Sequence, residues 1–144
     1  RGPSRPSLLR RLNRLGARTR QEVHVEPLWF GERGDEVRPG CVSGLAGDPP
    51  SLGALARGVA RGIARNLRMR LPSEAFRGRR RVVGSGNALR RNPLLRAMIC
   101  EEFGLPLVLS RAAEETAWGA ALVARRLVAG TCPPLTVPRR ATPR

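Results

Sequence analysis

The chain has 144 residues, 41% of them hydrophobic, and a formal net charge of +16 at pH 7. Its length and hydrophobic content suit a single globular domain and argue against a disordered chain. No apolar run approaches the roughly 20 residues of a membrane span and no signal peptide is recognisable, so we expect a cytoplasmic protein without a membrane partner.

The positive charge makes nucleic-acid binding an alternative function. All 27 basic residues are arginine, which is typical of a GC-rich coding bias, and they are spread from Arg1 to Arg144. The three Phe and two Trp offer few surfaces on which bases could stack. We therefore favour the absence of a nucleic-acid partner. Because residue 1 is Arg rather than Met, we expect the sequence to begin inside a longer reading frame.

The potential metal ligands are too scattered to predict a metal site. Cys41, Cys100 and Cys132 lie far apart without Cys-x-x-Cys spacing, and His24 is the only histidine. We expect reduced, partly buried thiols and no metal ligand.

The first third of the chain predicts a helix, a strand and a long loop. Leucines at helical spacing favour a short amphipathic helix within residues 1–20, and Gly16 is expected to end it. Its apolar stripe consists of Leu8, Leu9, Leu12 and Leu15. Val23–Phe30 is predicted as a strand that Pro27 shortens, with His24 on its less buried face. Gly31–Pro50 is rich in Gly and Pro and is predicted as a surface loop.

A long helix is predicted from about Leu52 to Leu71, with Ser51 as its N-cap. The residues expected on its buried face are Leu52, Leu55, Val59, Ile63 and Leu67. A second stripe consists of Arg57, Arg61, Arg65 and Arg68. This stripe would suit either a ridge that follows phosphates or a solvated helix face. We favour the solvated face because no aromatic residue lies among the arginines.

The next elements alternate between strand and helix. A short strand at residues 81–83 leads into Gly84-Ser85-Gly86-Asn87, and Asn92-Pro93 begins a helix that ends at Phe103 before Gly104. Its inward residues are expected to be Leu94, Leu95, Met98 and Ile99.

The last third predicts a buried strand, a final helix and a tail. Leu105–Leu109 is nearly all apolar, as in a strand covered on both faces. Ala113–Ala129 is predicted as a helix with one face of small residues, ended by Gly130. The Pro- and Arg-rich residues 131–144 are predicted to be disordered. The order of elements favours an α/β fold with a mainly parallel sheet and flanking helices, within one domain at residues 1–130.

Glycines between a strand and a helix let backbone amides approach a phosphate, although a tight structural turn explains such a pair equally well. A dinucleotide fingerprint fails because Leu89 replaces its third small residue and Ser110 replaces its acid. A P-loop fails because the chain has no lysine.

Residues 84–95 instead resemble the adenosine loop of the FGGY carbohydrate kinases, closest to the sedoheptulokinase branch, in which Gly-Ser-Gly, Ala-Leu and Arg-Asn lead into a helix. Three further segments are similar to that family in the same order. They are Gly31-Glu32-Arg33, Leu55 to Leu67, and Ala117-Trp118-Gly119-Ala120-Ala121-Leu122.

The resemblance implies a partial actin-like ATPase (ribonuclease H-like) domain whose sheet is incomplete at its N-terminal side. It also implies ATP and Mg²⁺ as cofactors, with Gly84, Ser85, Gly86 and Asn87 lining the adenosine and its α-phosphate and Asn92 at the adenine edge. No catalytic base is assigned, since Asp35 and Asp48 fall outside the matching segments.

Three functions therefore remain open. The full-length protein phosphorylates a sedoheptulose-type ketose with ATP, and this chain supplies adenosine-binding residues but no catalytic base. Alternatively, the chain is a basic nucleic-acid-binding module or an inactive, marginally stable fragment. The oligomeric state stays undetermined at this stage.

Overall fold

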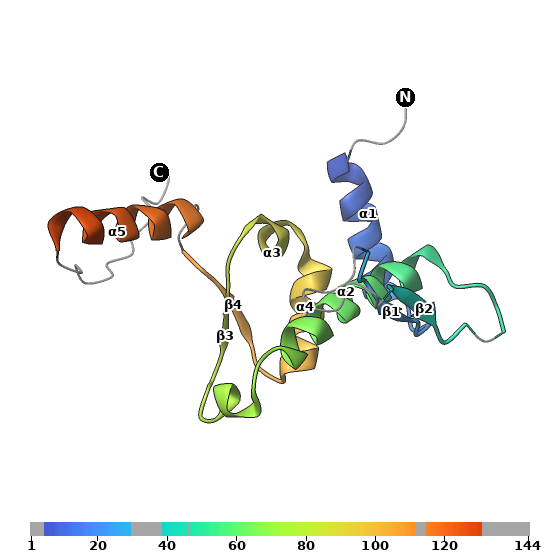
Figure 1. The fold of residues 1–144 in the computed structure, drawn as a ribbon. Coiled ribbons are helices and arrows are strands. Elements are labelled where there is room, and N and C mark those ends of the chain that lie inside the picture. The colour runs from blue at the N-terminus through green and yellow to red at the C-terminus, as the bar shows by residue number, and fades with distance from the viewer. Residues whose placement is uncertain (1–4, 30–38, 46, 112–114, 131–144) are drawn as a thin grey trace.

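The computed structural model describes residues 5–29, 39–45, 47–111 and 115–130. In chain order the elements are α1 Arg5–Arg18, β1 His24–Glu26, β2 Cys41–Ser43, α2 Leu52–Met69, the 3₁₀ turn η1 Ser73–Phe76, β3 Val82–Gly84, α3 Asn87–Arg91, α4 Pro93–Phe103, β4 Leu107–Leu109 and α5 Glu115–Ala129. Figure 1 shows α1 and α4 beside α2, the strand pair β1 and β2 next to α2, the pair β3 and β4 beyond α4, and the last helix, α5, standing apart.

Helices α1 and α2 cross closely at two glycines. Gly16 is buried inside α1, so the prediction that it ends the helix is wrong. A Cβ at Gly16 would lie 2.5 Å from Leu94 Cδ2, and one at Gly53 would lie 2.8 Å from Leu15 O. Gly16 is therefore a packing residue, whose missing side chain lets α1 lie against α2 and α4.

Helix α2 begins at its predicted cap, because Ser51 Oγ accepts a hydrogen bond from Ala54 N at 3.1 Å. The predicted buried face is wrong at Leu52, Ile63 and Leu67, which are exposed, whereas Leu55 and Val59 are partly buried and pack against a core cluster. The buried positions are small residues, namely Gly53, Ala54, Gly58, Ala60, Gly62 and Ala64. The three glycines lie directly against neighbouring backbone, whereas Ala60 and Ala64 pack against side chains of α4.

Strand β1 supplies part of that backbone. Val23 and Val25 are buried near α2, and a Cβ at Gly58 would lie 2.7 Å from Val23 O. His24 is exposed, as predicted. Strand β2 pairs antiparallel with β1, with Val25 opposite Val42. The prediction of a loop is therefore wrong at residues 41–43, while residues 31–38 lie outside the described part of the chain.

Helix α4 carries the main core, and its predicted bounds are confirmed. Gly104 ends it with a left-handed conformation, at a φ of 61°. The four predicted inward residues are buried and pack against Ala60 and Ala64 of α2. The local signals at both ends of this helix agree with its packing, which explains why the sequence defines it well.

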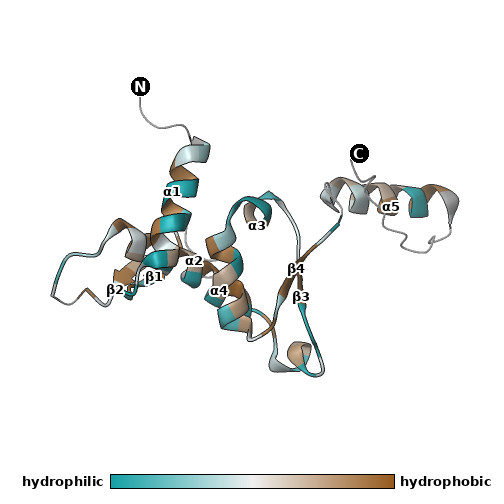
Figure 2. Cartoon of the chain, turned by 180° about the vertical axis from the view of Figure 1, so that it is seen from behind, coloured by the Kyte–Doolittle hydropathy of each residue, from teal (hydrophilic) through white to brown (hydrophobic). Residues whose placement is uncertain are grey.

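Strands β3 and β4 pair in parallel, with Val83 opposite Val108. Both are strongly hydrophobic in Figure 2, yet both of these valines are exposed. The predicted covering of the second strand on both faces is therefore wrong within this chain. Among the described residues the chain has one parallel and one antiparallel strand pair, so a mainly parallel sheet stays a prediction.

Helix α5 ends at Gly130, as predicted, with a φ of 63°. Its described side chains are mostly exposed, and Val128 reaches 90%. The predicted start at residue 113 and the predicted disordered tail at residues 131–144 lie outside the described residues. Within those residues we find no helix long and apolar enough to cross a membrane.

Candidate functional site

Two glycines shape the turn that follows β3. Gly84 is buried, and a Cβ there would lie 2.6 Å from Leu89 Cδ1 and 3.0 Å from Leu107 Cδ1. Gly86 has a φ of 90°, which side chains rarely permit, although the space around it is open. The first glycine therefore allows close packing, and the second allows the backbone to turn into α3 beside open space.

The turn lies at the carboxyl edge of the parallel strand pair. Ser110 N donates to Gly84 O at 2.8 Å, which extends the ladder by one residue beyond β4. Arg90 Nη2 donates to Ser110 O at 2.9 Å and ties α3 to the same edge. Ligands of α/β proteins bind outside the carboxyl ends of parallel strands, so the turn occupies a position suited to binding.

Helix α3 is short and was not predicted. It connects the glycine turn to α4, and Arg96 of α4 donates hydrogen bonds to its backbone. Arg96 Nη1 donates to Leu89 O at 2.7 Å and to Arg90 O at 3.2 Å. These bonds satisfy carbonyl groups in the last turn of α3 that lack helical partners. The glycine turn is therefore held by two arginines that the sequence pattern did not single out as site residues.

The structure brings four of the five predicted site residues together and separates the fifth. Gly84, Ser85, Gly86 and Asn87 form one continuous turn, with the side chains of Ser85 and Asn87 exposed. Asn92 lies at the other end of α3, where Asn92 Oδ1 accepts from Leu95 N at 2.9 Å. Its predicted role as an N-cap is confirmed.

A further asparagine supports the same helix. Asn13 of α1 accepts a hydrogen bond at Oδ1 from Leu94 N, at 3.1 Å. The sequence analysis missed Asn13. The signal that was present is an asparagine between Leu12 and Leu15 on the apolar stripe of α1.

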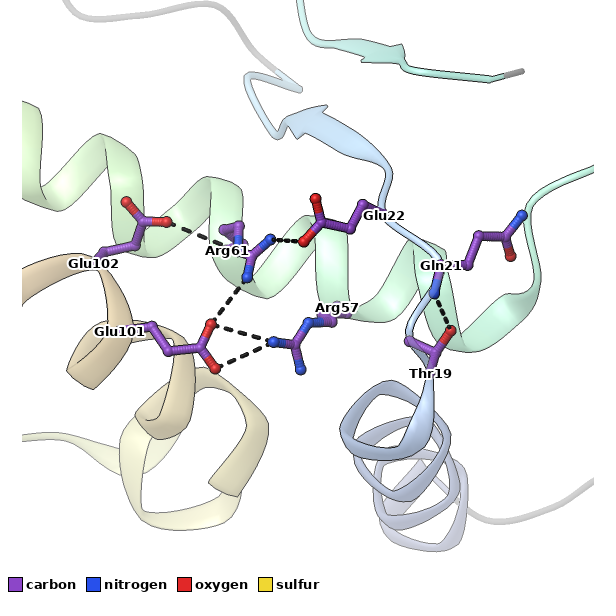
Figure 3. A network of polar contacts seen from close by, with 7 residues as sticks. All are labelled: Thr19, Gln21, Glu22, Arg57, Arg61, Glu101 and Glu102. Atoms are coloured by element: carbon purple, nitrogen blue, oxygen red, sulfur yellow. Dashed lines mark hydrogen bonds and ion pairs between the residues drawn. The ribbon is translucent and has the colours of Figure 1, made fainter. Parts of the chain in front are cut away.

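Two arginines of the predicted α2 stripe form ion pairs inside the chain (Figure 3). Arg57 Nη2 lies 3.1 Å from Glu101 Oε1, and Arg61 Nη2 lies 2.9 Å from Glu101 Oε2. The hydrogen bond that Arg61 donates to Glu101 is the main cause of the raised pKa of Arg61. Arg68 lies over the ring of Phe76, at 3.8 Å from its centroid. The stripe is therefore neither a free phosphate ridge nor, along most of its length, a simple solvated face.

The described cysteines and acidic residues form no cluster that could hold a metal ion. Cys41 is a free, exposed thiol and Cys100 a free, half-buried one. Among the described residues no three His, Cys, Asp or Glu side chains lie close enough to hold a metal ion. No residue of this part of the chain is therefore assigned to Mg²⁺. Asp48 is exposed, and Asp35 and the Gly31-Glu32-Arg33 segment lie outside the described residues.

Comparison with known proteins identifies the family. The sequence model of the C-terminal domain of the FGGY family of carbohydrate kinases matches residues 5–127. The chain belongs to this family. The predicted resemblance is thereby confirmed, and residues 5–127 include the glycine turn, α3 and α4.

Two relatives of this FGGY chain are sedoheptulokinases. The chain is 36% identical to the mouse enzyme over 101 residues, which are 69% of this chain and 21% of that protein. It is 36% identical to the human enzyme over 104 residues, which are 71% of this chain and 22% of that protein. The FGGY chain thus spans about a fifth of the length of the curated relatives it matches.

A solved structure supports the fold. The crystal structure of xylulose kinase from Rhodospirillum rubrum aligns with 84% of this FGGY chain and 26% of its own, with a TM-score of 0.65 and 19% sequence identity. This likeness establishes that the chain has the fold of the corresponding part of an FGGY kinase.

Proposed function

We propose that the full-length protein carrying this chain transfers a phosphoryl group from ATP to a hydroxyl group of a sedoheptulose-type ketose. Membership of the FGGY family supports the reaction class. The two sedoheptulokinases among its relatives support the sugar class. Within this reaction the chain supplies the adenosine-binding part of the C-terminal lobe, at residues 1–130.

The observation that carries the proposal is the glycine turn at the carboxyl edge of β3 and β4. Gly86 adopts a φ of 90° beside open space, so an incoming ligand can approach its backbone directly. The exposed side chains of Ser85 and Asn87 flank that backbone. We infer that Gly84, Ser85, Gly86 and Asn87 contact the adenosine and its α-phosphate, and that Asn92 contacts the adenine edge.

The chain positions the nucleotide and performs no proton transfer in this proposal. We assign neither the base that accepts the sugar proton nor a Mg²⁺ ligand to it. Bound Mg²⁺ supplies charge neutralisation at the transferring phosphoryl group in ATP-dependent kinases. We therefore expect the 144-residue chain alone to lack kinase activity, because it spans only about a fifth of its relatives.

Replacement of Gly86 tests the proposal. In the full-length protein, Gly86→Val places a side chain where the backbone must face the nucleotide, and we expect the Kd for ATP to rise about tenfold or more. Isothermal calorimetry measures this change. Gly78→Val is a matched control, because Gly78 also has a positive φ, of 69°, and open space around it but lies outside the turn. Equal ATP affinity in the two variants would remove the glycine turn from the nucleotide site.

A further inference from the structure

The first turn of α4 has every backbone amide satisfied. Its first residue, Pro93, has no N–H group to satisfy. Leu94 N donates to Asn13 Oδ1 at 3.1 Å, and Leu95 N donates to Asn92 Oδ1 at 2.9 Å. Helix N-termini otherwise leave such amides without partners. Two asparagines that are 79 positions apart in the chain thus share the capping of one helix.

Asn13 is held rigidly for this task. It is 7% exposed, and it is the buried polar side chain among the described residues. Asn13 Nδ2 donates to Leu9 O at 2.9 Å within α1, which turns Oδ1 toward α4. Both ends of the Asn13 amide are therefore bonded, and its orientation is fixed by the chain rather than by solvent.

Because Asn13 and Asn92 each accept from a different amide of α4, the free group of Asn92 that could face a ligand is determined. An N-cap side chain accepts from either the second or the third amide of its helix. Because Asn13 takes the second amide, at Leu94, the oxygen of Asn92 stays on the third, at Leu95. Within the described part of the chain the Asn92 Nδ2 group has no hydrogen-bond partner. Asn92 thus presents an N–H donor, suited to an acceptor nitrogen of a heteroaromatic base.

We propose that Asn13 is a positioning residue of the nucleotide site, which fixes the orientation of Asn92 by removing the competing amide of Leu94. The inference rests on the proposed function, since it assumes that Asn92 contacts the base. Asn13 itself contacts no ligand in this proposal. Its effect passes through the first turn of α4.

The test uses steady-state kinetics of the full-length protein. For Asn13→Ala we expect the KM for ATP to rise about fivefold, the size expected for one misplaced hydrogen bond. The KM for the sugar and kcat stay unchanged, because the other contacts are not altered. Asn66→Ala is the control: Asn66 is a half-buried asparagine on α2 that lines the groove beside β1. We expect no change in any kinetic constant for this variant.

A second variant keeps the proposal falsifiable if Asn13→Ala does not fold. Asn13→Ser can donate its hydroxyl to Leu9 O, as serines within helices do, but its side chain is shorter by one bond and cannot keep the bond from Leu94 N. We therefore expect the KM for ATP to rise as in Asn13→Ala, and a folded Asn13→Ser protein with an unchanged KM for ATP would overturn the inference. So would an Asn13→Ala protein whose three kinetic constants are unchanged or are altered together.

The Gly86→Val variant separates the two proposals. If Gly86→Val weakens ATP binding and Asn13→Ala leaves the KM for ATP unchanged, only the role of Asn13 is refuted. If neither variant affects ATP, the nucleotide site itself is refuted.

Discussion

Helix α4 buries its four inward apolar side chains, whereas strands β3 and β4 each leave the central valine exposed and α5 leaves most of its described side chains exposed. Met98 of α4 is fully buried, while Val83 of β3 is 64% exposed. The fully buried core of the described residues therefore lies on α2, α4 and the segment of β1, while Val82, Leu89 and Leu107 pack against its edge. The glycine turn is attached to that body through α3 and the arginine contacts of its last turn.

The two regions also differ in the residues that make their contacts. Around α2 the close contacts are made by glycine and alanine, because backbone lies directly against three glycines and side chains of α4 pack against Ala60 and Ala64. The larger residues Leu52 and Leu67 remain exposed.

The largest effect should come from a glycine of the packed region. A Cβ at Gly62 would meet Val25 O, so Gly62→Ala forces β1 away from α2. We expect a loss of at least about 3 kcal/mol in the free energy of unfolding, measured by urea unfolding at low protein concentration. Gly119→Ala on α5 is the control, because nothing lies within 4 Å of that position. It should be neutral or stabilising by up to about 1 kcal/mol. Similar losses of unfolding free energy in both variants would contradict the proposal that α2 is closely packed and α5 is not.

The next effect concerns the core of α4. Met98→Ala removes a fully buried side chain and should lower the free energy of unfolding by about 2–3 kcal/mol. Val128→Ala removes a side chain that is 90% exposed and should change it by less than about 0.5 kcal/mol. The same urea titration compares the two variants. A loss above about 1 kcal/mol in Val128→Ala would mean that α5 packs against the chain in solution.

The smallest effect on stability should come from replacing an exposed leucine of α2. Leu67→Gln removes exposed apolar surface, so we expect less aggregation by light scattering and a change in stability below about 0.5 kcal/mol. The unmodified chain alone should be marginally stable, or aggregate as the protein concentration rises. A cooperative transition above about 55 °C by circular dichroism would show that β3, β4 and α5 need no further cover.

The sequence predicted those elements whose ends carry local signals. Ser51, Asn92-Pro93 and Gly104 act through bonds or dihedral angles within a few residues, so their roles were readable without the fold. Helix α4 followed from them, whereas the family resemblance rested on the motif of residues 84–95 and on three further segments in the same order. The roles of individual residues at the nucleotide site remain predictions.

Features that depend on distant contacts were not predicted. Glycine commonly ends helices, but Gly16 packs against Leu94 and lies within α1. Strand β2 has three residues and is defined only by pairing with β1. The buried face of α2 was assigned to large apolar residues because their spacing was helical, whereas the fully buried positions are small residues that lie against neighbouring backbone or α4. Asn13 was missed for the same reason, since its partner lies on α4.

The ion pairs of Arg61 show one position at which lysine could not replace arginine. Nη1 of Arg61 faces Glu22, Nη2 faces Glu101, and Nε lies 3.8 Å from Glu102. A lysine carries one nitrogen on a flexible stem and cannot reach three carboxylates held at these separate places. Over most of the chain an exchange of arginine for lysine would preserve the charge at little cost. At Arg61 the same exchange would break the link that joins Glu22, Glu101 and Glu102, although the apolar contacts between α2 and α4 and the Arg57–Glu101 pair would remain.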